Sequence, residues 1–516
     1  MKPTILLVEN ILDTRESTTD VLESEGYNVL QAASVEEARA ILEKELVHVA
    51  LIDVRLTKED RDENDVSGLE LCKQMGKGIP RVVLSAFKHW QAVRPVAESL
   101  VSKASGPETL LAEIRHVLTH DYDLLPHRRF AILTSGGDSP GMNAAIWSAL
   151  RTALAEGIEM FAINDGYQGL IEDRVDRLRW RSVADTLMTG GTMLGTARSE
   201  EFKTSEDSRR VAARNLKKRH IDGLIVMGGD GSMQGAQKLV AAMKAIGADL
   251  KTIALPGTID NDLSGTDMSI GAASSVAAVM HEINNMVAPA RALRRVFICE
   301  IMGRHSGFLT LEAGLCVGAE AVLLPEELVQ IRGNPNAAEW SGNIDYHATR
   351  RRVEDALKDI AKQLELTFVT EKRHAFVLFS EGIRLLCTED KYEHVNLDTI
   401  TRCLRAEIAQ WKLVPKADVR SQVIGYPMRG AAPSRYDMHL GTTLGAAAVR
   451  ALIDGKNELM LGWSERTGTV IETPFDKVIA NSKRAPAVKY QDPERESWRK
   501  TVALQRTLVK PLPRWF

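Results

Sequence analysis

The feature that most constrains this chain is a pair of short apolar runs, each followed at once by a loop that carries glycine and aspartate. Residues 221–227 (IDGLIVM) lead into residues 228–232 (GGDGS), and residues 252–255 (TIAL) lead into residues 256–262 (PGTIDND). Such runs predict parallel strands, and open parallel sheets bind their ligands beyond the carboxyl ends of the strands. We therefore expect a phosphate site, a metal site and a general base to lie together at one edge of a sheet.

The size and charge of the chain limit its organisation and its partners. With 516 residues it exceeds a single ordinary core, and about three or four units of roughly 150 residues are predicted. The 66 basic and 69 acidic side chains give a net charge of -3, so we expect no nucleic acid and no membrane as partner. The five cysteines are widely spaced without a C-x-x-C pattern, which argues against a disulfide framework or a zinc site. No signal peptide is apparent and no apolar stretch reaches about 18 residues, so we expect a cytoplasmic location.

The first 120 residues alternate between strand-like and helix-like segments. Strands are predicted at residues 5–8, 27–30, 49–52, 81–84 and 100–102, and helices at residues 14–26 and 34–45, with Thr14 and Ser34 as N-caps. This βα alternation predicts a parallel sheet. Polar side chains follow four of the strands at the same predicted edge, namely Glu9, Asn10, Asp53, Ser85 and Lys103.

On these residues, the segment 1–120 resembles the receiver domain of two-component response regulators over its whole length. The resemblance implies a (βα)5 fold, a phosphoryl group accepted by Asp53, and a histidine kinase or another phosphodonor as partner. It further implies Mg²⁺ beside Glu9, Asn10 and Asp53, a switch hydroxyl on Ser85, and a Lys103 ammonium that pairs with the phosphate. An aspartyl nucleophile needs such a cation and such a donor to stabilise the charge of the product.

Three features depart from the receiver pattern. Asn10 stands where the family has a second carboxylate, Ala104 stands where a proline usually follows the lysine, and residues 58–65 form an acidic insertion. Two interpretations therefore stay open. The segment is either a receiver that is phosphorylated or a degenerate one that serves as a docking or dimerising module.

A larger body is expected after a linker at residues 121–129, which contains a proline and no periodic pattern. Glycine pairs at predicted strand ends in this body leave backbone N–H groups free to face a phosphate. The chain has neither a Walker A loop nor the protein-kinase motifs, so phosphoryl transfer would need another architecture. Six motifs follow one another along the body: SGGDSPGMNA from Ser135, GGTMLGTAR from Gly190, GGDGS from Gly228, PGTIDND from Pro256, EIMGR from Glu300 and GYPMRG from Gly425.

These six motifs, in this order, are similar to those of the ATP-dependent 6-phosphofructokinases, and the resemblance covers residues 130–486. It implies two Rossmann-like α/β subdomains that transfer the γ-phosphate of ATP to the 1-hydroxyl of fructose 6-phosphate with Mg²⁺ as cofactor. Asp260 would be the catalytic base, and Asp230 the carboxylate linked to Mg²⁺. Arg198 and Arg304 would neutralise the charge of the transition state. Thr258 would steady the transferred group, and the Gly137 N–H would face the nucleotide phosphates.

The same resemblance implies the binding residues. Those for the nucleotide are Gly137, Arg198, Ser199, Gly229, Asp230, Gly231, Ser232 and Gly257. Those for the sugar phosphate are Thr258, Asp260, Arg295, Met302, Gly303, Arg304, Glu381, Arg420, Tyr426 and Arg429. Because Arg295 would reach in from a neighbouring subunit, a homo-oligomer, either a dimer or a tetramer, is expected.

Two glycines indicate the phosphoryl donor. Relatives that use pyrophosphate carry a second aspartate after G-G-D and a lysine after the proline of the P-x-T-I-D-N-D motif, where this chain has Gly231 and Gly257. Side chains there would fill space that the α-phosphate and adenosine need, so ATP is the predicted donor.

A second, effector-binding site of bacterial relatives is only partly present. Two of its arginines are replaced by Trp147 and Val287, so we expect weaker binding of anionic effectors and hypothesise that control has moved to the receiver. The residues that do match that site are Arg151, Glu320, Lys372 and Arg373.

Two alternatives to a phosphofructokinase stay open. Tyr426 replaces a histidine of many relatives, which leaves room for a kinase of another sugar phosphate such as sedoheptulose 7-phosphate. A non-catalytic sensor of sugar phosphate or nucleotide is the other alternative, although the four intact residues Asp260, Asp230, Arg198 and Arg304 argue against it. Residues 330–343 are expected to form a surface excursion, and residues 487–516 a C-terminal tail.

Overall fold

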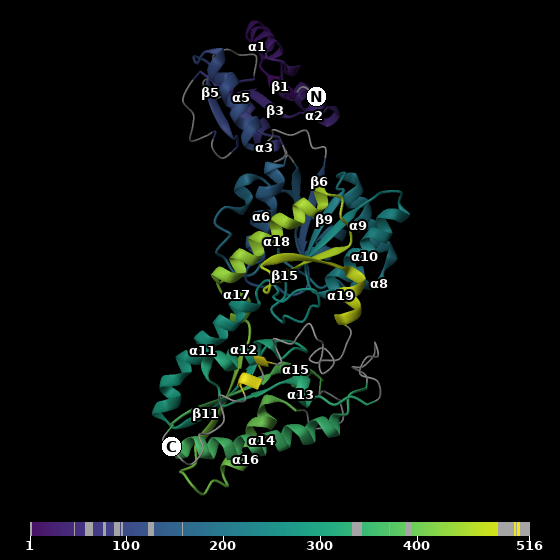
Figure 1. Ribbon diagram of the computed structural model, residues 1–516. Coiled ribbons are helices and arrows are strands. Elements are labelled where there is room, and N and C mark those ends of the chain that lie inside the picture. The colour runs from purple at the N-terminus through teal and green to yellow at the C-terminus, as the bar shows by residue number, and fades with distance from the viewer. Residues whose placement is uncertain are drawn as a thin grey trace. The chain divides into compact units, whose positions relative to one another are not determined.

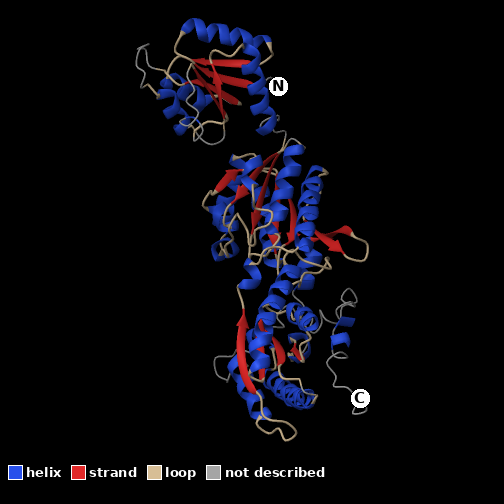
Figure 2. Ribbon diagram, turned by 90° about the vertical axis from the view of Figure 1, so that its left-hand side faces the viewer, coloured by secondary structure: helices blue, strands red, loops and turns tan. Residues whose placement is uncertain are grey.

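The computed structural model describes residues 3–45, 47–56, 65–75, 79–86, 93, 96–121, 128–156, 158–332, 343–370, 372–386, 395–482, 500–501 and 503–505. The chain divides into two compact units, of which residues 1–127 with 154–159 form the first and residues 128–153 with 160–516 the second. Figure 1 follows the chain from its N-terminus to its C-terminus, and Figure 2 distinguishes its helices and strands. Four segments discussed above lie wholly or mostly outside the described residues: the acidic insertion, the linker, the centre of the excursion at 330–343, and the tail.

Five strands form one sheet in the described part of the first unit, in the order β2-β1-β3-β4-β5. They are β1 (Thr4–Val8), β2 (Asn28–Ala32), β3 (Val49–Asp53), β4 (Arg81–Ser85) and β5 (Ser99–Ser102), and all pairs are parallel. The helices α1 (Leu12–Ser24), α2 (Val35–Lys44), α3 (Ser67–Gln74) and α5 (Pro107–Asp121) alternate with these strands. Alternate strand side chains pack into two buried clusters, one on each face, which confirms the predicted parallel βα sheet.

The two predicted N-caps of this unit have different outcomes. Ser34 precedes α2, and its hydroxyl accepts a hydrogen bond of 3.2 Å from the Glu37 N–H, as predicted. The prediction for Thr14 is wrong, because α1 begins two residues earlier, after Ile11, whose side chain offers no acceptor. Periodicity locates a helix better than it locates the first residue of that helix.

The larger sheet of the second unit contains, among the described residues, seven strands in the order β16-β15-β10-β9-β6-β7-β8. The central strands β6, β9 and β10 are parallel and almost fully buried, whereas β15 with β16 and β7 with β8 pair antiparallel. The strands predicted at residues 221–227 and 252–255 are confirmed as β9 and β10. The bounds are β6 (Arg129–Thr134), β7 (Glu159–Ile163), β8 (Val175–Arg177), β9 (Gly223–Gly228), β10 (Lys251–Pro256), β15 (Leu459–Ser464) and β16 (Thr469–Pro474).

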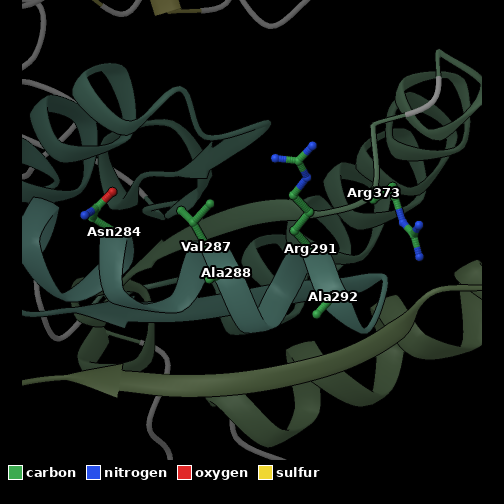
Figure 3. Close-up of a pocket in the computed structure, with 6 residues that line it drawn as sticks. All are labelled: Asn284, Val287, Ala288, Arg291, Ala292 and Arg373. Atoms are coloured by element: carbon green, nitrogen blue, oxygen red, sulfur yellow. The ribbon is translucent and has the colours of Figure 1, made fainter.

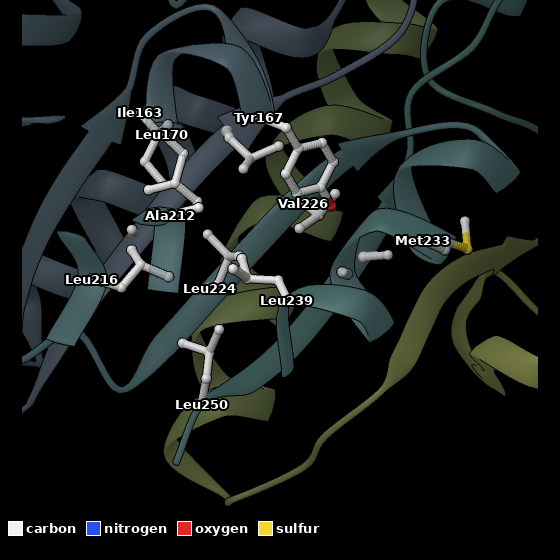
Figure 4. Close-up of a cluster of buried hydrophobic side chains, with 14 of the residues drawn as sticks. Ile163, Tyr167, Leu170, Ala212, Leu216, Leu224, Val226, Met233, Leu239 and Leu250 are labelled. Carbon is white, nitrogen blue, oxygen red and sulfur yellow. The ribbon is translucent and has the colours of Figure 1, made fainter. Parts of the chain in front are cut away.

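Helices cover both faces of this sheet. On one face α7 (Gly166–Ile171), α9 (Glu206–Lys218), α10 (Asp230–Ala245) and α19 (Phe475–Ser482) bury the cluster that includes Leu224 and Val226 (Figure 4). On the other face α6 (Met142–Ala155) lies beside α18 (Arg435–Ile453) (Figure 1). Gly441 and Gly445 of α18 face the backbone of residues 141–145 so closely that a Cβ would clash there, so these two helices pack backbone to backbone.

The smaller sheet of the second unit has, among the described residues, four parallel strands in the order β12-β13-β11-β14. They are β12 (Ala321–Leu323), β13 (Ala375–Ser380), β11 (Arg295–Ile301) and β14 (Asp418–Ile424). The helices α11 (Ala272–Ala292) and α12 (Phe308–Val317) cover one face, and α14 (Tyr346–Val369) and α16 (Leu397–Ile408) cover the other (Figure 1).

Short elements connect these layers. They are the 3-10 helix η1 (Trp180–Val183) and the helices α8 (Glu200–Thr204), α13 (Pro325–Leu328), α15 (Glu381–Leu386) and α17 (Pro427–Gly430). The helices and parallel sheets of both units confirm the predicted α/β class. Within the described ranges no helix is long and apolar enough to cross a membrane, and the four cysteines found there are free thiols.

Candidate phosphoryl-transfer site

Both acidic, glycine-bearing loops leave the larger sheet at the same edge. The strands β9 and β10 are neighbours in parallel register, with Gly228 opposite Pro256, so the loops that follow them begin side by side. The Gly257 N–H donates a hydrogen bond of 3.2 Å to the Gly228 carbonyl oxygen and extends the pairing by one step. The expected meeting of the two loops at one sheet edge is therefore confirmed.

The loop that carries Asp260 is held by its own polar groups. Asn261 has a left-handed φ of 47°. Its side-chain oxygen accepts a hydrogen bond of 2.8 Å from the Ser269 N–H, and its side-chain nitrogen donates one of 3.1 Å to the Asp267 carbonyl oxygen. The Ser269 hydroxyl donates to the Thr258 carbonyl oxygen at 2.6 Å. An asparagine side chain tolerates this backbone conformation and supplies local hydrogen bonds, so the loop is fixed before any ligand binds.

Asp260 has the properties expected of a general base. It is 8% exposed, and its Oδ1 has no hydrogen-bond partner among the described residues. Burial, together with the nearby carboxylates Asp262 and Glu381, raises the pKa of this carboxyl to about 7 against the lowering effect of Arg429 and Arg304. A carboxylate that titrates near neutral pH can both accept a proton and release it.

Three loops are hydrogen-bonded into one cradle beside this carboxylate. Gly136, just after β6, has a φ of 94°, and its carbonyl oxygen accepts a 3.0 Å bond from the Thr196 hydroxyl. The Thr134 hydroxyl donates to the Gly195 carbonyl oxygen at 2.6 Å, and the Ser232 hydroxyl donates to the Ser135 carbonyl oxygen at 3.1 Å. The glycine-rich stretches after β6, before α8 and after β9 therefore form a single structure.

The start of α10 offers room for an anion and its metal ion. Asp230 is the first residue of this helix, Gly229 is the N-cap, and a Cβ at Gly229 or Gly231 would meet no atom within 4 Å. Bare backbone N–H groups at a helix N-terminus favour phosphate, and Mg²⁺ bound with phosphates needs only one or two carboxylates. The residues present therefore fit a magnesium-bound nucleotide. The described part of the chain has no group of three or more His, Cys, Asp or Glu side chains arranged to hold a metal ion by themselves.

Asn143 has a role that the sequence reasoning missed. This residue of α6 is 2% exposed, and its amide nitrogen donates to the carbonyl oxygens of Thr189 at 3.1 Å and Gly190 at 3.3 Å. Its amide oxygen accepts from the Met193 N–H at 2.7 Å. Asn143 thus fixes the loop that leads to Arg198, which is itself exposed. The only signal in the sequence is the place of Asn143 in the motif that begins at Ser135.

The turn after β11 presents Arg304. Both Gly303, with φ 153°, and Arg304, with φ 51°, have positive φ, and the side chain of Arg304 is exposed. One carboxylate oxygen of Glu381 accepts both backbone N–H groups, from Gly303 at 3.0 Å and from Arg304 at 2.7 Å. Glu381 therefore supports the turn, in addition to the sugar contact expected of it.

Arg429 lies against the loop expected to bind the nucleotide. It extends from α17, and its Nη1 donates to the Asp138 carbonyl oxygen at 2.9 Å, beside the face of Gly137 that lacks a side chain. The charge of Arg429 also lowers the pKa of Asp260, so the guanidinium acts electrostatically on this carboxyl. The structure thus brings Gly137, Asp260 and Arg429 together, as expected of one site.

Arg295 and Arg420 lie elsewhere. Arg295 begins β11, and both arginines bind the Asp418 carboxylate on the exposed edge strand β14, at 3.2 Å and 2.8 Å. At about 3.3 Å per strand residue, Arg295 is on the order of 20 Å from the turn at Gly303. The structure therefore groups Arg420 with Arg295, which is expected to serve a neighbouring subunit, and separates both from Arg304. Of the other expected sugar ligands, Met302 is partly buried and Tyr426 is 79% exposed.

The first unit has its own polar site at the carboxyl edge of its sheet. The Lys103 ammonium donates to Glu9 at 2.6 Å and to Asp53 at 2.7 Å, and the Glu9 and Asp53 side chains are almost fully buried. Burial raises the pKa of Asp53 although the bond to Lys103 opposes it. Ser85 ends the adjacent strand β4, and Asn10 follows β1. The predicted receiver residues therefore lie at one edge, and Glu9 and Asp53 supply the oxygen ligands that Mg²⁺ prefers.

A hollow lies on the second unit, along the C-terminal half of α11 (Figure 3). It has a volume of about 640 Å³ and is lined by Asn284, Val287, Ala288, Arg291, Ala292 and Arg373. Lys372 pairs with the buried Glu320 nearby, whereas the Arg151 guanidinium stacks on Trp180 at 3.1 Å. Val287 thus lines a basic hollow, while Trp147 lies beside an arginine that is already stacked on another ring.

Comparisons with known proteins agree with this geometry. The family model for Phosphofructokinase matches residues 129–452, which include all six motifs. The chain belongs to the phosphofructokinase family. The model for the Response regulator receiver domain matches residues 5–115, so a receiver domain precedes the phosphofructokinase body.

Individual relatives support the same assignment. The ATP-dependent 6-phosphofructokinase of Staphylococcus epidermidis is 37% identical over 359 residues, which cover 69% of this chain and 95% of that protein. The corresponding protein of Staphylococcus carnosus is 38% identical over 358 residues, covering 69% and 94%. The solved phosphofructokinase of Saccharomyces cerevisiae has a TM-score of 0.59 at 29% identity, over 74% of this chain and 50% of the yeast chain. This phosphofructokinase therefore spans about half of the yeast chain and belongs to a family of sugar-phosphate phosphotransferases.

Proposed function

We propose that the body of this phosphofructokinase transfers the γ-phosphate of ATP to the 1-hydroxyl of fructose 6-phosphate. The observation that carries the proposal is the state of Asp260, a buried carboxylate with a free Oδ1 and a pKa raised to about 7. Asp260 takes the proton of the sugar hydroxyl as that oxygen attacks the phosphorus. Its fixed loop holds the Oδ1 atom in place before the substrate arrives.

The transferring group needs positive charge around it. Arg304 on its constrained turn and Arg429 beside Gly137 supply this charge from two sides, and Arg198 adds to it from the loop held by Asn143. Thr258 precedes the base by two residues, and its hydroxyl is within 3.2 Å of the Asp260 N–H. When bound with the nucleotide at Asp230, Mg²⁺ neutralises the charge of the donor phosphates.

The choice of ATP rests on the two glycines that distinguish the donors. A side chain at Gly231 would stand in open space at the start of α10, where an aspartate would repel the α-phosphate of ATP. A side chain at Gly257 would instead run into Met142 and Met227, so this glycine is also needed for packing. The relatives named ATP-dependent support the same choice. A solved pyrophosphate-dependent relative from Marinobacter aquaeolei, at 19% identity and a TM-score of 0.52, shares the fold alone.

The sugar's terminal phosphate is bound, in this proposal, by a second copy of the chain. Arg295 and Arg420 are too far from Arg304 to serve its site within one chain, and both stand on the exposed edge of the smaller sheet. The protein therefore acts as a homo-oligomer, a dimer or a tetramer, in which these arginines complete a neighbour's site.

The receiver regulates the body in this proposal. Asp53 accepts a phosphoryl group with Mg²⁺ held by Glu9, Asn10 and Asp53, and Lys103 transfers its bond from the carboxylate to the phosphate. The Ser85 hydroxyl is the switch group that responds to the phosphorylation of Asp53. Comparing activity and sugar cooperativity before and after treatment with beryllium fluoride, a mimic of phospho-aspartate, tests this role. An identical rate and cooperativity in both states would contradict it.

The catalytic proposal is tested by an ADP-release assay on the full chain. Fructose 6-phosphate, sedoheptulose 7-phosphate and related sugar phosphates are supplied with MgATP, and the Asp260→Ala variant serves as control. The expected result is ADP release that depends on fructose 6-phosphate and is absent from the variant. Release with sedoheptulose 7-phosphate alone would identify another sugar kinase, and binding without release would identify a sensor.

A further inference from the structure

The turn that presents Arg304 has an unfavourable backbone. Gly303 and Arg304 follow one another with φ of 153° and 51°, and the left-handed conformation of a non-glycine residue costs on the order of 1 kcal/mol. The Ser306 N–H closes the turn on the Gly303 carbonyl oxygen at 2.8 Å. A turn of this kind persists only where its surroundings hold it.

The start of α15 provides that support. Glu381 accepts the N–H groups of both positive-φ residues on one oxygen, and the Ser380 hydroxyl donates to the Ser306 carbonyl oxygen at 3.2 Å. A Cβ at Gly382 would lie 2.5 Å from the Arg304 carbonyl oxygen, so the first turn of α15 presses directly on this backbone. Because one oxygen accepts both bonds, the position of the Glu381 side chain decides the geometry of the turn.

Arg384 lies one turn further along α15, between two carboxylates. Its Nε donates at 2.8 Å to Oε1 of Glu300, whose side chain is 7% exposed on β11. Its Nη2 lies 3.7 Å from the second oxygen of Glu381. The guanidinium therefore bridges two largely buried carboxylates, and its loss would remove the contact that fixes the second oxygen of Glu381.

We propose that Arg384, tethered by Glu300, is a positioning residue that holds Glu381 in place on the Gly303–Arg304 turn, and thereby aims the Arg304 guanidinium. The inference rests on the proposed function in so far as Arg304 faces the transferring phosphoryl group. Arg384 lies outside the six motifs and has no role among the expected site residues. It acts through Glu381 and need not touch the substrate.

Amide hydrogen exchange at Gly303 and Arg304 tests this arrangement without depending on catalysis. In the full-length Arg384→Met variant, both amides should exchange at least about tenfold faster than in the wild type, because their acceptor is no longer fixed. Arg384→Lys should give intermediate exchange, since an ammonium keeps the charge but loses the planar fork. Unchanged protection of these two amides in Arg384→Met would overturn the proposal.

Steady-state kinetics separate positioning from sugar binding. A misaimed Arg304 should lower kcat of Arg384→Met roughly tenfold to hundredfold with a smaller change in the KM for fructose 6-phosphate, and the lysine variant should recover part of kcat. A raised sugar KM with kcat preserved would mean that Glu381 acts only as a sugar ligand, and would overturn the inference.

A matched control is available on α14, where Arg350 pairs with Glu354 and is 40% exposed, close to the 36% of Arg384. Arg350→Met should leave both exchange and kcat unchanged.

If Arg384→Met fails to fold by circular dichroism, Glu300→Gln removes the tether alone and should raise the same two exchange rates. A wild-type protein without phosphotransfer activity would refute the proposed function, while the exchange experiment would still decide the role of Arg384.

Discussion

The Nη1 atom of Arg429 donates a hydrogen bond of 2.9 Å to the carbonyl oxygen of Asp138. Arg429 belongs to α17, which packs on α11 beside the smaller sheet, whereas Asp138 follows a strand of the larger sheet. The bond therefore joins the two halves of the second unit at the proposed site. Since the same guanidinium lowers the pKa of Asp260, it links the donor loop to the base.

Replacement of Arg429 should change the pH dependence as well as the rate. Loss of this cation removes an interaction that favours the ionised form of Asp260, so the carboxyl pKa should rise above about 7. In Arg429→Met the acid limb of kcat/KM should move to higher pH, and kcat/KM at pH 7 should fall about a hundredfold because the transition state also loses a cation. Arg429→Lys should keep the acid limb near its original position.

The exposed Arg435, which begins α18 six positions after Arg429, is the matched control for this experiment. Arg435→Met removes the same charge from the same part of the chain, so its pH–rate profile should match the wild type. An unshifted acid limb in Arg429→Met would show that Arg429 does not face Asp260 in the working enzyme.

Asp260→Asn should separate activity from stability. The variant cannot accept a proton, so kcat should fall about a thousandfold, and wild-type activity should itself decline below pH 7 as Asp260 is protonated. The folded state holds the proton of this carboxyl more tightly than the unfolded state does, so the stability of the wild type decreases as pH rises from about 4 to 7. The side-chain amide of Asp260→Asn does not ionise, so the stability of this variant does not decrease with pH for this reason.

Thermal unfolding at several pH values measures the second effect. At pH 8, Asp260→Asn should melt a few degrees above the wild type, and the difference should shrink towards pH 5, where wild-type Asp260 is protonated. An equal difference in Tm at both pH values would mean that the pKa of Asp260 is not raised by burial.

Much of the fold followed from local sequence pattern, whereas the support of the site did not. Buried runs such as residues 49–52 and 252–255 predict strands because a parallel sheet buries both faces. The pairing of Glu381 with Gly303 and Arg304 joins residues 77 and 78 positions apart, and no local periodicity encodes such a bond. For the same reason Arg384 and Asn143 were not predicted as supporting residues.

The sequence also did not predict that Arg420 lies far from Arg304. The family resemblance placed both arginines among the sugar ligands, but only the register of β14 on β11 shows that Arg420 lies opposite Phe297, well before the end of the strand. The start of α1 was missed for a different reason, because Ile11 gives no capping signal.

The receiver should bind Mg²⁺ more tightly when its missing carboxylate is restored. In Asn10→Asp a third acid joins Glu9 and Asp53, so the Mg²⁺ concentration for half-maximal phosphorylation by acetyl phosphate should fall about tenfold. Phosphate-affinity gels measure the modified fraction, and Asp53→Asn should show none. Equal Mg²⁺ dependence in Asn10→Asp and the wild type would indicate that residue 10 does not contribute to the metal site.

Gly231→Asp should distinguish ATP from pyrophosphate as the donor. The new carboxylate would stand in open space in the first turn of α10, beside Asp230, so the fold should tolerate it and even gain slightly from the helix dipole. Its charge should repel the α-phosphate of ATP and raise the KM for MgATP at least about tenfold, with little change for fructose 6-phosphate. Gly231→Ala adds a methyl group without charge and should behave like the wild type. If Gly231→Asp left the KM for MgATP unchanged, the nucleotide could not lie along the start of α10, and the assignment of the donor site would fail.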